Sequence, residues 1–331
     1  MSTAPSLTAS PCRNEDTVTT QQIILLIAVC LVLLLAFIWL FGCIKLFRMA
    51  FLRRKKQGRN GSDYTLDEVY GERITAGIRY ADTLAHEEVS ILSHDGLHLR
   101  ASLYDTPNAT ATVILFHGYR SYGENDFGCV LSYYVEERGL RVLLVDQRAH
   151  GRSEGKYITF GILERYDCLA WANYVSERFG CDNRIILDGL SMGSSTVMMA
   201  SDLDLPDNVK AIIADCGYTS PDAILRKVGA DIRVPVGLFL GGVYGLCRLL
   251  AHFDPRATDA PRALAASHLP VLMVHGTGDD FVPCKMSCEN ARAGGDRVHL
   301  VLIEGAGHGL SYLVDPETVT KELSAFLDRY A

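Results

Sequence analysis

The pentapeptide G-L-S-M-G at residues 189–193 constrains this chain more than any other feature. It directly follows R-I-I-L at 184–187, a short apolar run with the pattern of a buried strand. The residues after it, 191–202, are small and Met-rich, as in a helix packed closely on a sheet. A tight strand-to-helix turn strains its central serine and needs neighbours without side chains. The pattern therefore predicts that Ser191 is an exposed nucleophile, and an ordinary Gly/Ser turn is the alternative.

A serine hydroxyl needs an adjacent base, which a third group orients. In folds built around such an elbow, the acid and then the histidine follow the serine along the chain. P-V-L-M-V-H at 270–275 predicts a strand, and Asp279 lies in the loop after it, with Asp280 as its rival. H-L-V-L-I at 299–303 predicts the next strand, and His308 follows it between two glycines. The chain holds ten histidines, so this position, and not the residue type, selects His308 as the base.

The oxyanion formed during attack on a carbonyl needs backbone donors from an earlier strand end. V-I-L-F at 113–116 predicts that strand, and H-G opens the loop after it. We expect the backbone N–H groups of Tyr119 and Met192 to stabilise the oxyanion. The imidazole of His117 is expected to brace this loop rather than to react.

Five segments carry a family resemblance. They are H-G at 117–118, D-Q-R-A-H-G-R-S-E-G at 146–155, G-L-S-M-G at 189–193, H-G-T-G-D-D-F-V-P at 275–283 and G-A-G-H at 305–308. In this order they resemble the α/β-hydrolase superfamily, in particular its membrane-anchored or intracellular esterases, acylglycerol lipases and serine-aminopeptidase-like hydrolases. The resemblance covers roughly residues 85–330.

The resemblance implies that Ser191, Asp279 and His308 form a catalytic triad that uses no cofactor and no metal. It also implies a structural role for the D-x-R-x-H-G-x-S segment, whose side chains would hold a loop after a strand: Asp146, Arg148, His150 and Ser153. Position 194 is serine where many relatives have glycine, which is a mild departure.

An uncharged apolar run covers residues 23–44 and has the length of one membrane-crossing helix. A signal peptide would need a basic segment before a shorter apolar core. The preceding tail has only Arg13, accompanied by Glu15 and Asp16. We therefore predict a retained transmembrane helix.

Basic residues follow this run, with no acidic residue among positions 45–59: Lys45, Arg48, Arg53, Arg54, Lys55, Lys56 and Arg59. The positive-inside rule places this flank in the cytoplasm. The tail at 1–22 would then lie outside the cell membrane and the catalytic domain inside. The same stretch can bind anionic lipid headgroups.

The remaining pattern alternates strands and helices, which predicts a mostly parallel sheet with helices on both faces. The expected organisation is a tail at 1–22, a transmembrane helix at 23–44, a basic juxtamembrane linker at 45–84 and an α/β-hydrolase domain at 85–331. A long segment at about 217–268 interrupts the alternation. We interpret it as a helical cap over the active site; a plain helical insertion and a surface that dips into the bilayer are the alternatives.

The net charge and the cysteine positions disfavour some classes of function. Taking the eight basic and two acidic residues of 1–59 from the totals of 32 and 39 leaves a net charge of −13 over 60–331. A field of that sign disfavours nucleic acid as a partner. The ten cysteines form no disulfide or metal framework; Cys284 and Cys288 share a predicted helix face but lack further ligands nearby.

The sequence therefore predicts a membrane-anchored serine hydrolase that acts on a carboxylic ester or related acyl bond of a small or lipid-derived substrate. Two alternatives stay open. One is an aminopeptidase or amidase on the same fold, which would need an acidic anchor for a substrate amine. The other is a non-catalytic membrane scaffold with a hydrolase fold.

Overall fold

The computed structural model describes residues 19–54 and 69–331 of the 331-residue chain. Eight strands form one sheet in the order β1-β2-β4-β3-β5-β6-β7-β8. The strands are β1 (Glu87–Leu92), β2 (His98–Tyr104), β3 (Ala111–Phe116), β4 (Arg141–Asp146), β5 (Arg184–Leu190), β6 (Val209–Asp215), β7 (Val271–Gly276) and β8 (Val298–Ile303). β2 runs antiparallel to β1 and β4, and all other pairs are parallel. The mostly parallel sheet is confirmed.

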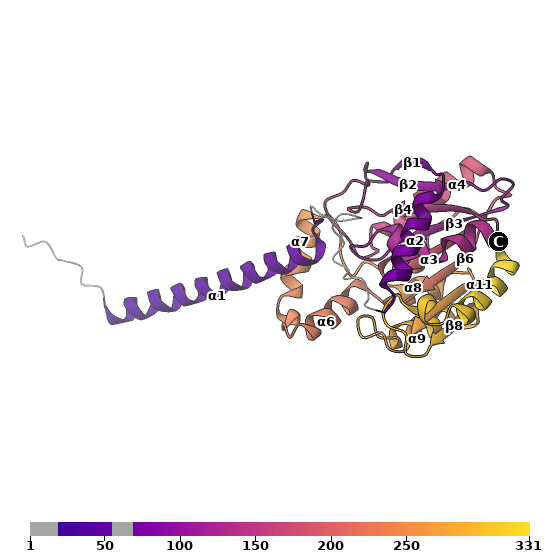
Figure 1. The fold of residues 1–331 in the computed structure, drawn as a ribbon. Helices are drawn as coiled ribbons and strands as arrows, with labels where there is room; N and C mark the ends of the chain where they lie inside the picture. The colour runs from indigo at the N-terminus through magenta and orange to yellow at the C-terminus, as the bar shows by residue number, and fades with distance from the viewer. Residues whose placement is uncertain (1–18, 55–68) are drawn as a thin grey trace, which may run out of the picture.

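Helices cover both faces of this sheet (Figure 1). They are α1 (Thr20–Phe51), α2 (Gly71–Thr83), α3 (Gly123–Ser132), α4 (Glu164–Phe179), α5 (Met192–Ala200), α6 (Pro221–Asp231), α7 (Leu240–Leu250), α8 (Ala260–Ala266), α9 (Lys285–Gly294), α10 (Ser311–Val314) and α11 (Pro316–Tyr330). Three short turns complete the list: a π-helical one, η1 (Tyr133–Glu137), and two 3₁₀ turns, η2 (Val236–Leu238) and η3 (Gly295–Arg297).

Side-chain alternation along the strands divides the core in two. In β3, Val113 and Leu115 point into the core beneath α2, α3 and α11, whereas Ile114 and Phe116 point into the core beneath α4, α5 and α8. Successive side chains of a strand face opposite sides, so an uninterrupted apolar strand is stable only when helices cover both faces.

α1 runs from Thr20 to Phe51 and extends well away from the sheet (Figure 1). Among the described residues, it is the one helix that is long and apolar enough to cross a membrane by length and composition. Only its last turns pack on the rest of the molecule, where Cys43, Phe47 and Phe51 are buried.

The expected linker at 45–84 is corrected in two places. Residues 45–51 continue α1, and Gly71–Thr83 form α2, which packs on α3. A Cβ atom on Gly77 would lie 2.6 Å from the backbone of Gly128. This close backbone approach depends on two glycines far apart in sequence, so local patterning did not predict the helix. The rest of the expected linker, 55–68, and the tail before residue 19 lie outside the described residues.

The segment interpreted as a cap, 217–268, divides into two parts, and we call the first part, α6 to α7, the cap. α6, η2 and α7 stand beside the end of α1 (Figure 1). α8 instead packs on α5 and α9 within the main domain. The buried faces of α6 and α7 contribute Ile224, Leu240 and Val243 to the same core as α5.

Candidate active site

Ser191 lies in the strained turn between β5 and α5. Its backbone has φ 56° and ψ −112°, in the region that side chains rarely occupy. The glycines on either side of Ser191 are required because a side chain at either position would overlap neighbouring backbone atoms. A Cβ atom on Gly193 would lie 1.7 Å from the carbonyl oxygen of Phe116, and one on Gly189 would lie 2.3 Å from the backbone of Gly193. The turn therefore has the geometry of a nucleophile elbow.

The structure brings together the three residues predicted from sequence. The Nε2 atom of His308 lies 2.9 Å from the Oγ atom of Ser191, and its Nδ1 atom lies 2.7 Å from Oδ2 of Asp279. Since a carboxylate accepts hydrogen bonds, Nδ1 carries the proton and Nε2 presents a lone pair to the serine. His308 follows β8 and Asp279 follows β7, so both side chains come from loops at the carboxyl edge of the parallel strands.

Burial separates Asp279 from its neighbour Asp280. Asp279 is buried, and its Oδ1 atom accepts hydrogen bonds from the backbone N–H groups of Phe281 and Val282 at 2.9 and 2.8 Å. Asp280 is exposed, and only its backbone carbonyl has a recorded hydrogen bond, from Lys227. The rival carboxylate therefore does not contact His308.

His275 is a member of this network that sequence reasoning did not find. Its Nε2 atom lies 3.2 Å from Oδ2 of Asp279 and 2.8 Å from the carbonyl oxygen of Val282. Burial by itself would raise the pKa of Asp279, but hydrogen bonds from His275 and His308 outweigh it and hold that pKa well below its ordinary value. Asp279 is therefore ionised at neutral pH. The one sequence signal was the position of His275 at the end of a predicted strand.

The loop that is predicted to hold the oxyanion lies directly beside the serine. A Cβ atom on Gly118 would be 3.4 Å from Cβ of Ser191. Asp126 of α3, a second residue that sequence reasoning missed, accepts a hydrogen bond of 2.6 Å from the Gly118 N–H. Met192 is the first residue of α5, where a helix leaves its N–H groups without intrahelical partners. Tyr119 and Ser191 line the same cavity.

Comparison with known proteins agrees with this geometry. A family model described as the alpha/beta hydrolase fold matches residues 111–239. An esterase from Pyrococcus furiosus superposes with a TM-score of 0.61 at 21% identity, covering 75% of this chain and 92% of the esterase. The chain has the α/β-hydrolase fold.

Two curated proteins show the similarity at the level of sequence. The uncharacterized protein YqkD of Bacillus subtilis is 26% identical over 226 residues, covering 68% of this chain and 72% of YqkD. A bifunctional esterase/perhydrolase of Acinetobacter calcoaceticus is 23% identical over 263 residues, covering 66% of this chain and 92% of that enzyme.

The D-Q-R-A-H-G-R-S segment braces the loop that is predicted to hold the oxyanion, which is the kind of structural role that its resemblance implied. Arg148 is buried and forms ion pairs with Asp167 and Asp95. His150 accepts a hydrogen bond of 3.0 Å at Nε2 from the backbone N–H of Arg120. Ser153 Oγ donates to the carbonyl oxygen of Asp146. These contacts connect the loop after β4 to the loop after β3.

His117 braces the same region. Its Nε2 atom accepts a hydrogen bond of 3.2 Å from the backbone N–H of Gln147, and its Nδ1 atom lies 2.8 Å from the carbonyl oxygen of Gly118. The ring is fully buried. Its contacts are those of the structural histidine that the sequence predicted.

Two residues of the candidate triad, Asp279 and His308, form a cluster with Cys216 that has metal-ligand chemistry. A thiol, a carboxylate oxygen and a ring nitrogen from Cys216, Asp279 and His308 lie within 4.8 Å of one another. A thiol must lose its proton to bind a metal, and burial raises the pKa of Cys216 well above its ordinary value. Asp279 also accepts the hydrogen bond from His308. These contacts favour a hydrogen-bonded network over a metal centre.

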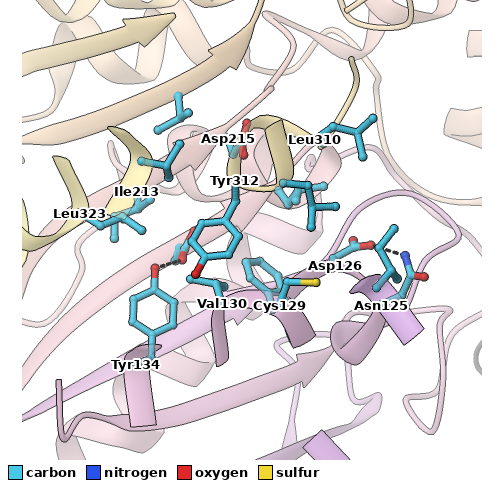
Figure 2. A pocket seen from close by; sticks show the side chains of 18 of the residues that line it. Asn125, Asp126, Cys129, Val130, Tyr134, Ile213, Asp215, Leu310, Tyr312 and Leu323 are labelled. Carbon is cyan, nitrogen blue, oxygen red and sulfur yellow. Dashed lines mark hydrogen bonds between the residues drawn. The ribbon is translucent and has the colours of Figure 1, made fainter. Parts of the chain in front are cut away.

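Two cavities lie beside the candidate active site. The larger, about 600 Å³, lies between α3 and α11 and reaches His308 but does not include Ser191 (Figure 2). The smaller, about 280 Å³, includes Ser191 and is bounded by α1, α6 and α7. Since the reacting carbonyl must contact the serine oxygen, the smaller cavity is the candidate substrate site despite its size.

The larger cavity holds a buried carboxylate, Asp188, which predicts a pH effect on stability. The hydroxyl of Tyr134 donates a 2.7 Å hydrogen bond to it, drawn in Figure 2. Burial raises the pKa of Asp188 to about 7. A raised folded-state pKa stabilises the protein fully below the unfolded pKa, and this contribution is lost as the pH rises through about 7.

Asp188→Asn cannot ionise and keeps an acceptor for Tyr134. Between pH 5 and 8, its free energy of unfolding should rise relative to wild type by on the order of 2 kcal/mol. Thermal or denaturant unfolding across this pH range measures the difference. Two stability curves that run parallel with pH would contradict the prediction.

Proposed function

We propose that this protein is a membrane-anchored serine hydrolase that cleaves carboxylic esters or related acyl bonds. The observation that carries the proposal is the continuous hydrogen-bonded chain from Ser191 through His308 to Asp279, set at a strained elbow. A base that a third group holds in the correct orientation beside a serine activates the serine hydroxyl. The esterase names of two similar proteins agree with an acyl substrate.

The first half of the reaction transfers the acyl group to the enzyme. Oγ of Ser191 attacks the carbonyl carbon while Nε2 of His308 takes the hydroxyl proton. The carbonyl oxygen becomes an oxyanion that the N–H groups of Tyr119 and Met192 stabilise. When the tetrahedral intermediate collapses, His308 gives its proton to the departing alkoxide, and the acyl group stays on the serine.

The second half releases the acid. His308 removes a proton from water, and the resulting hydroxide attacks the acyl carbonyl. Collapse of the second intermediate breaks the bond to Oγ, and His308 returns the proton to Ser191. Asp279 stays ionised throughout and stabilises the imidazolium in each half, in keeping with its depressed pKa.

The cavity beside Ser191 favours an acyl ester over the aminopeptidase alternative. Among the described residues that line it, none is aspartate or glutamate. A free substrate amine would need such an anchor. The lining is instead almost entirely apolar, which suits an alkyl chain.

α1 supports the membrane assignment. Its length and composition suit a span, and the basic residues at 45–59 would place the catalytic domain in the cytoplasm with the N-terminus outside. In this proposal the helix is retained as a single-pass anchor.

A fluorophosphonate probe tests the proposal on the full chain in detergent or nanodiscs. An activated serine displaces the fluoride and becomes covalently labelled, so the wild type should label and Ser191→Ala should not. Ser194→Ala is the matched control because Ser194 is also buried in the elbow region but contacts neither His308 nor Asp279 in the recorded hydrogen bonds. It should keep the label. A folded, unlabelled wild type would favour the scaffold alternative.

A further inference from the structure

We propose that the end of α1 is a wall of the substrate cavity, and that this cavity takes the acyl chain of a membrane lipid ester directly from the bilayer. This inference rests on the proposed serine hydrolase function and specifies its substrate class. It gives α1 a second role in addition to anchoring.

The first observation is the lining of the cavity that contains Ser191. One side is formed by the last turns of α1, through Leu46, Met49 and Ala50. The facing side comes from the cap, including Val228 of α6 and Val243 of α7. The anchor helix and the cap thus enclose the nucleophile between them, and a catalytic domain without α1 would lack one wall.

The second observation is the position along α1 at which the cap contacts it. The indole Nε1 of Trp39 donates a 2.9 Å hydrogen bond to the carbonyl oxygen of Leu238. A Cβ atom on Gly42 would lie 2.6 Å from the ring of Phe239, and one on Gly242 would lie 2.5 Å from Sγ of Cys43. Small residues let the two backbones approach closely.

The α1 residues in these contacts lie within the apolar run 23–44. About twenty helical residues cross the roughly 30 Å hydrocarbon core of a bilayer, so a span that begins at Ile23 reaches its far boundary near Gly42. η2 and the start of α7 are therefore placed at the membrane interface. Figure 1 shows α6 and α7 beside this end of α1.

The third observation is the exposed surface of the cap. Leu238 and Leu249 are each 70% exposed, and Ile232 is 50% exposed. Large apolar side chains at this depth along α1 would contact lipid rather than water. The hydrogen bond between Trp39 and Leu238 joins this surface to the exposed apolar surface of α1, and we therefore take the lipid bilayer as what covers it.

The fourth observation connects α1 to the chemistry. The hydroxyl of Tyr119 donates a 2.7 Å hydrogen bond to the carbonyl oxygen of Ala50, and the guanidinium of Arg120 donates to that of Met49. These carbonyls lie at the C-terminal end of the helix, where cationic and donor groups bind favourably. The cavity wall and the oxyanion loop are therefore held together as one unit.

The cavity size favours an acyl chain longer than acetyl. At about 30 Å³ for each water-sized group, the cavity of about 280 Å³ has room for roughly ten methylene-sized groups. A medium-length chain fills it, and a short acetyl group does not.

Chain-length selectivity is the first test. The full chain in phosphatidylcholine nanodiscs is given p-nitrophenyl acetate and p-nitrophenyl decanoate. Ala50→Trp, and Val228→Trp on the opposite wall, should lower kcat/KM for the decanoate at least about tenfold more than for the acetate, because each methylene kept out of an apolar site weakens binding several-fold. Ile44→Trp is the matched control, since Ile44 lies on α1, is 39% exposed and does not line the cavity; it should leave both rates unchanged.

An unchanged selectivity in both wall variants, with fluorophosphonate labelling intact, would overturn the inference but not the proposed function. A wild type that takes no label would overturn the proposed function itself. Because the two wall variants lie on separate helices, the test still gives a result if one of them fails to fold.

Lipid contact is the second test. Nanodiscs that contain phosphatidylcholine with a photoreactive acyl chain should crosslink to the cap segment 232–250 as well as to α1. Strand β1, which carries the 61% exposed Leu92 and is drawn apart from α1 in Figure 1, is the control and should not crosslink. Crosslinks confined to α1 would mean that the cap lies in water and the cavity takes soluble esters, which overturns the bilayer route.

Discussion

Replacing Asp279 by asparagine should lower kcat/KM for an ester substrate by about 10³- to 10⁴-fold. The carboxylate accepts a hydrogen bond from the Nδ1–H group of His308 and keeps the lone pair of Nε2 directed at Ser191. An asparagine can present its amide N–H to Nδ1, which favours the other tautomer and places a proton where the serine needs a base. Steady-state hydrolysis of a p-nitrophenyl ester measures the loss.

Asp280→Asn is the matched control for this prediction. It removes the same charge one residue later, but from an exposed side chain with no recorded hydrogen bond. We expect kcat/KM within a few-fold of wild type, as for most surface substitutions. Equal losses in the two variants would mean that net charge in the loop, rather than orientation of His308, supports catalysis.

Gly193→Ala should unfold or severely destabilise the domain, by more than about 4 kcal/mol. Its new Cβ atom would lie 1.7 Å from the carbonyl oxygen of Phe116. The Cβ atom is fixed to the backbone of α5 and its partner belongs to the backbone of β3, so no side-chain rotation relieves the overlap. The elbow would have to move away from the strand, and Ser191 would leave His308. Thermal unfolding and fluorophosphonate labelling should both report the loss.

Gly245→Ala is the control for backbone effects of glycine replacement. Gly245 lies inside α7, and an added Cβ atom meets nothing within 4 Å. Alanine favours a helix over glycine by roughly 1 kcal/mol, so this variant should be slightly more stable than wild type and should label normally. A Gly193→Ala protein as stable as wild type would show that α5 can shift away from β3 at little cost.

The positions of Ser191, Asp279 and His308 were predicted from the elbow motif and from the chain order of serine, acid and histidine. Loops after parallel strands gather at one edge of a sheet, so three residues far apart in sequence could be expected to meet. The choice between Asp279 and Asp280 was beyond that rule. Adjacent residues in a loop differ in where they point, and only the packed loop buries one of them and hydrogen-bonds it to His308.

Sequence reasoning did not find the supporting residues of the site that belong to no motif. His275 and Asp126 act through single hydrogen bonds to Asp279 and to the Gly118 N–H. A lone histidine or aspartate has no pattern that distinguishes it from a surface residue. α2 was missed for a related reason, because the contact between Gly77 and Gly128 joins segments that no local periodicity relates.

By itself, the sequence determined the sheet, the elbow and the existence of an apolar span, because alternation, glycine spacing and run length are local properties of a chain. Tertiary structure alone decided what the span does at its end. Whether Leu46 and Ala50 face lipid, water or a catalytic serine depends on which segments fold back against them. Here the cap, more than 170 residues later, closes over that end of the helix, and the reason lies in contacts between Trp39, Gly42 and η2–α7 that no stretch of sequence contains.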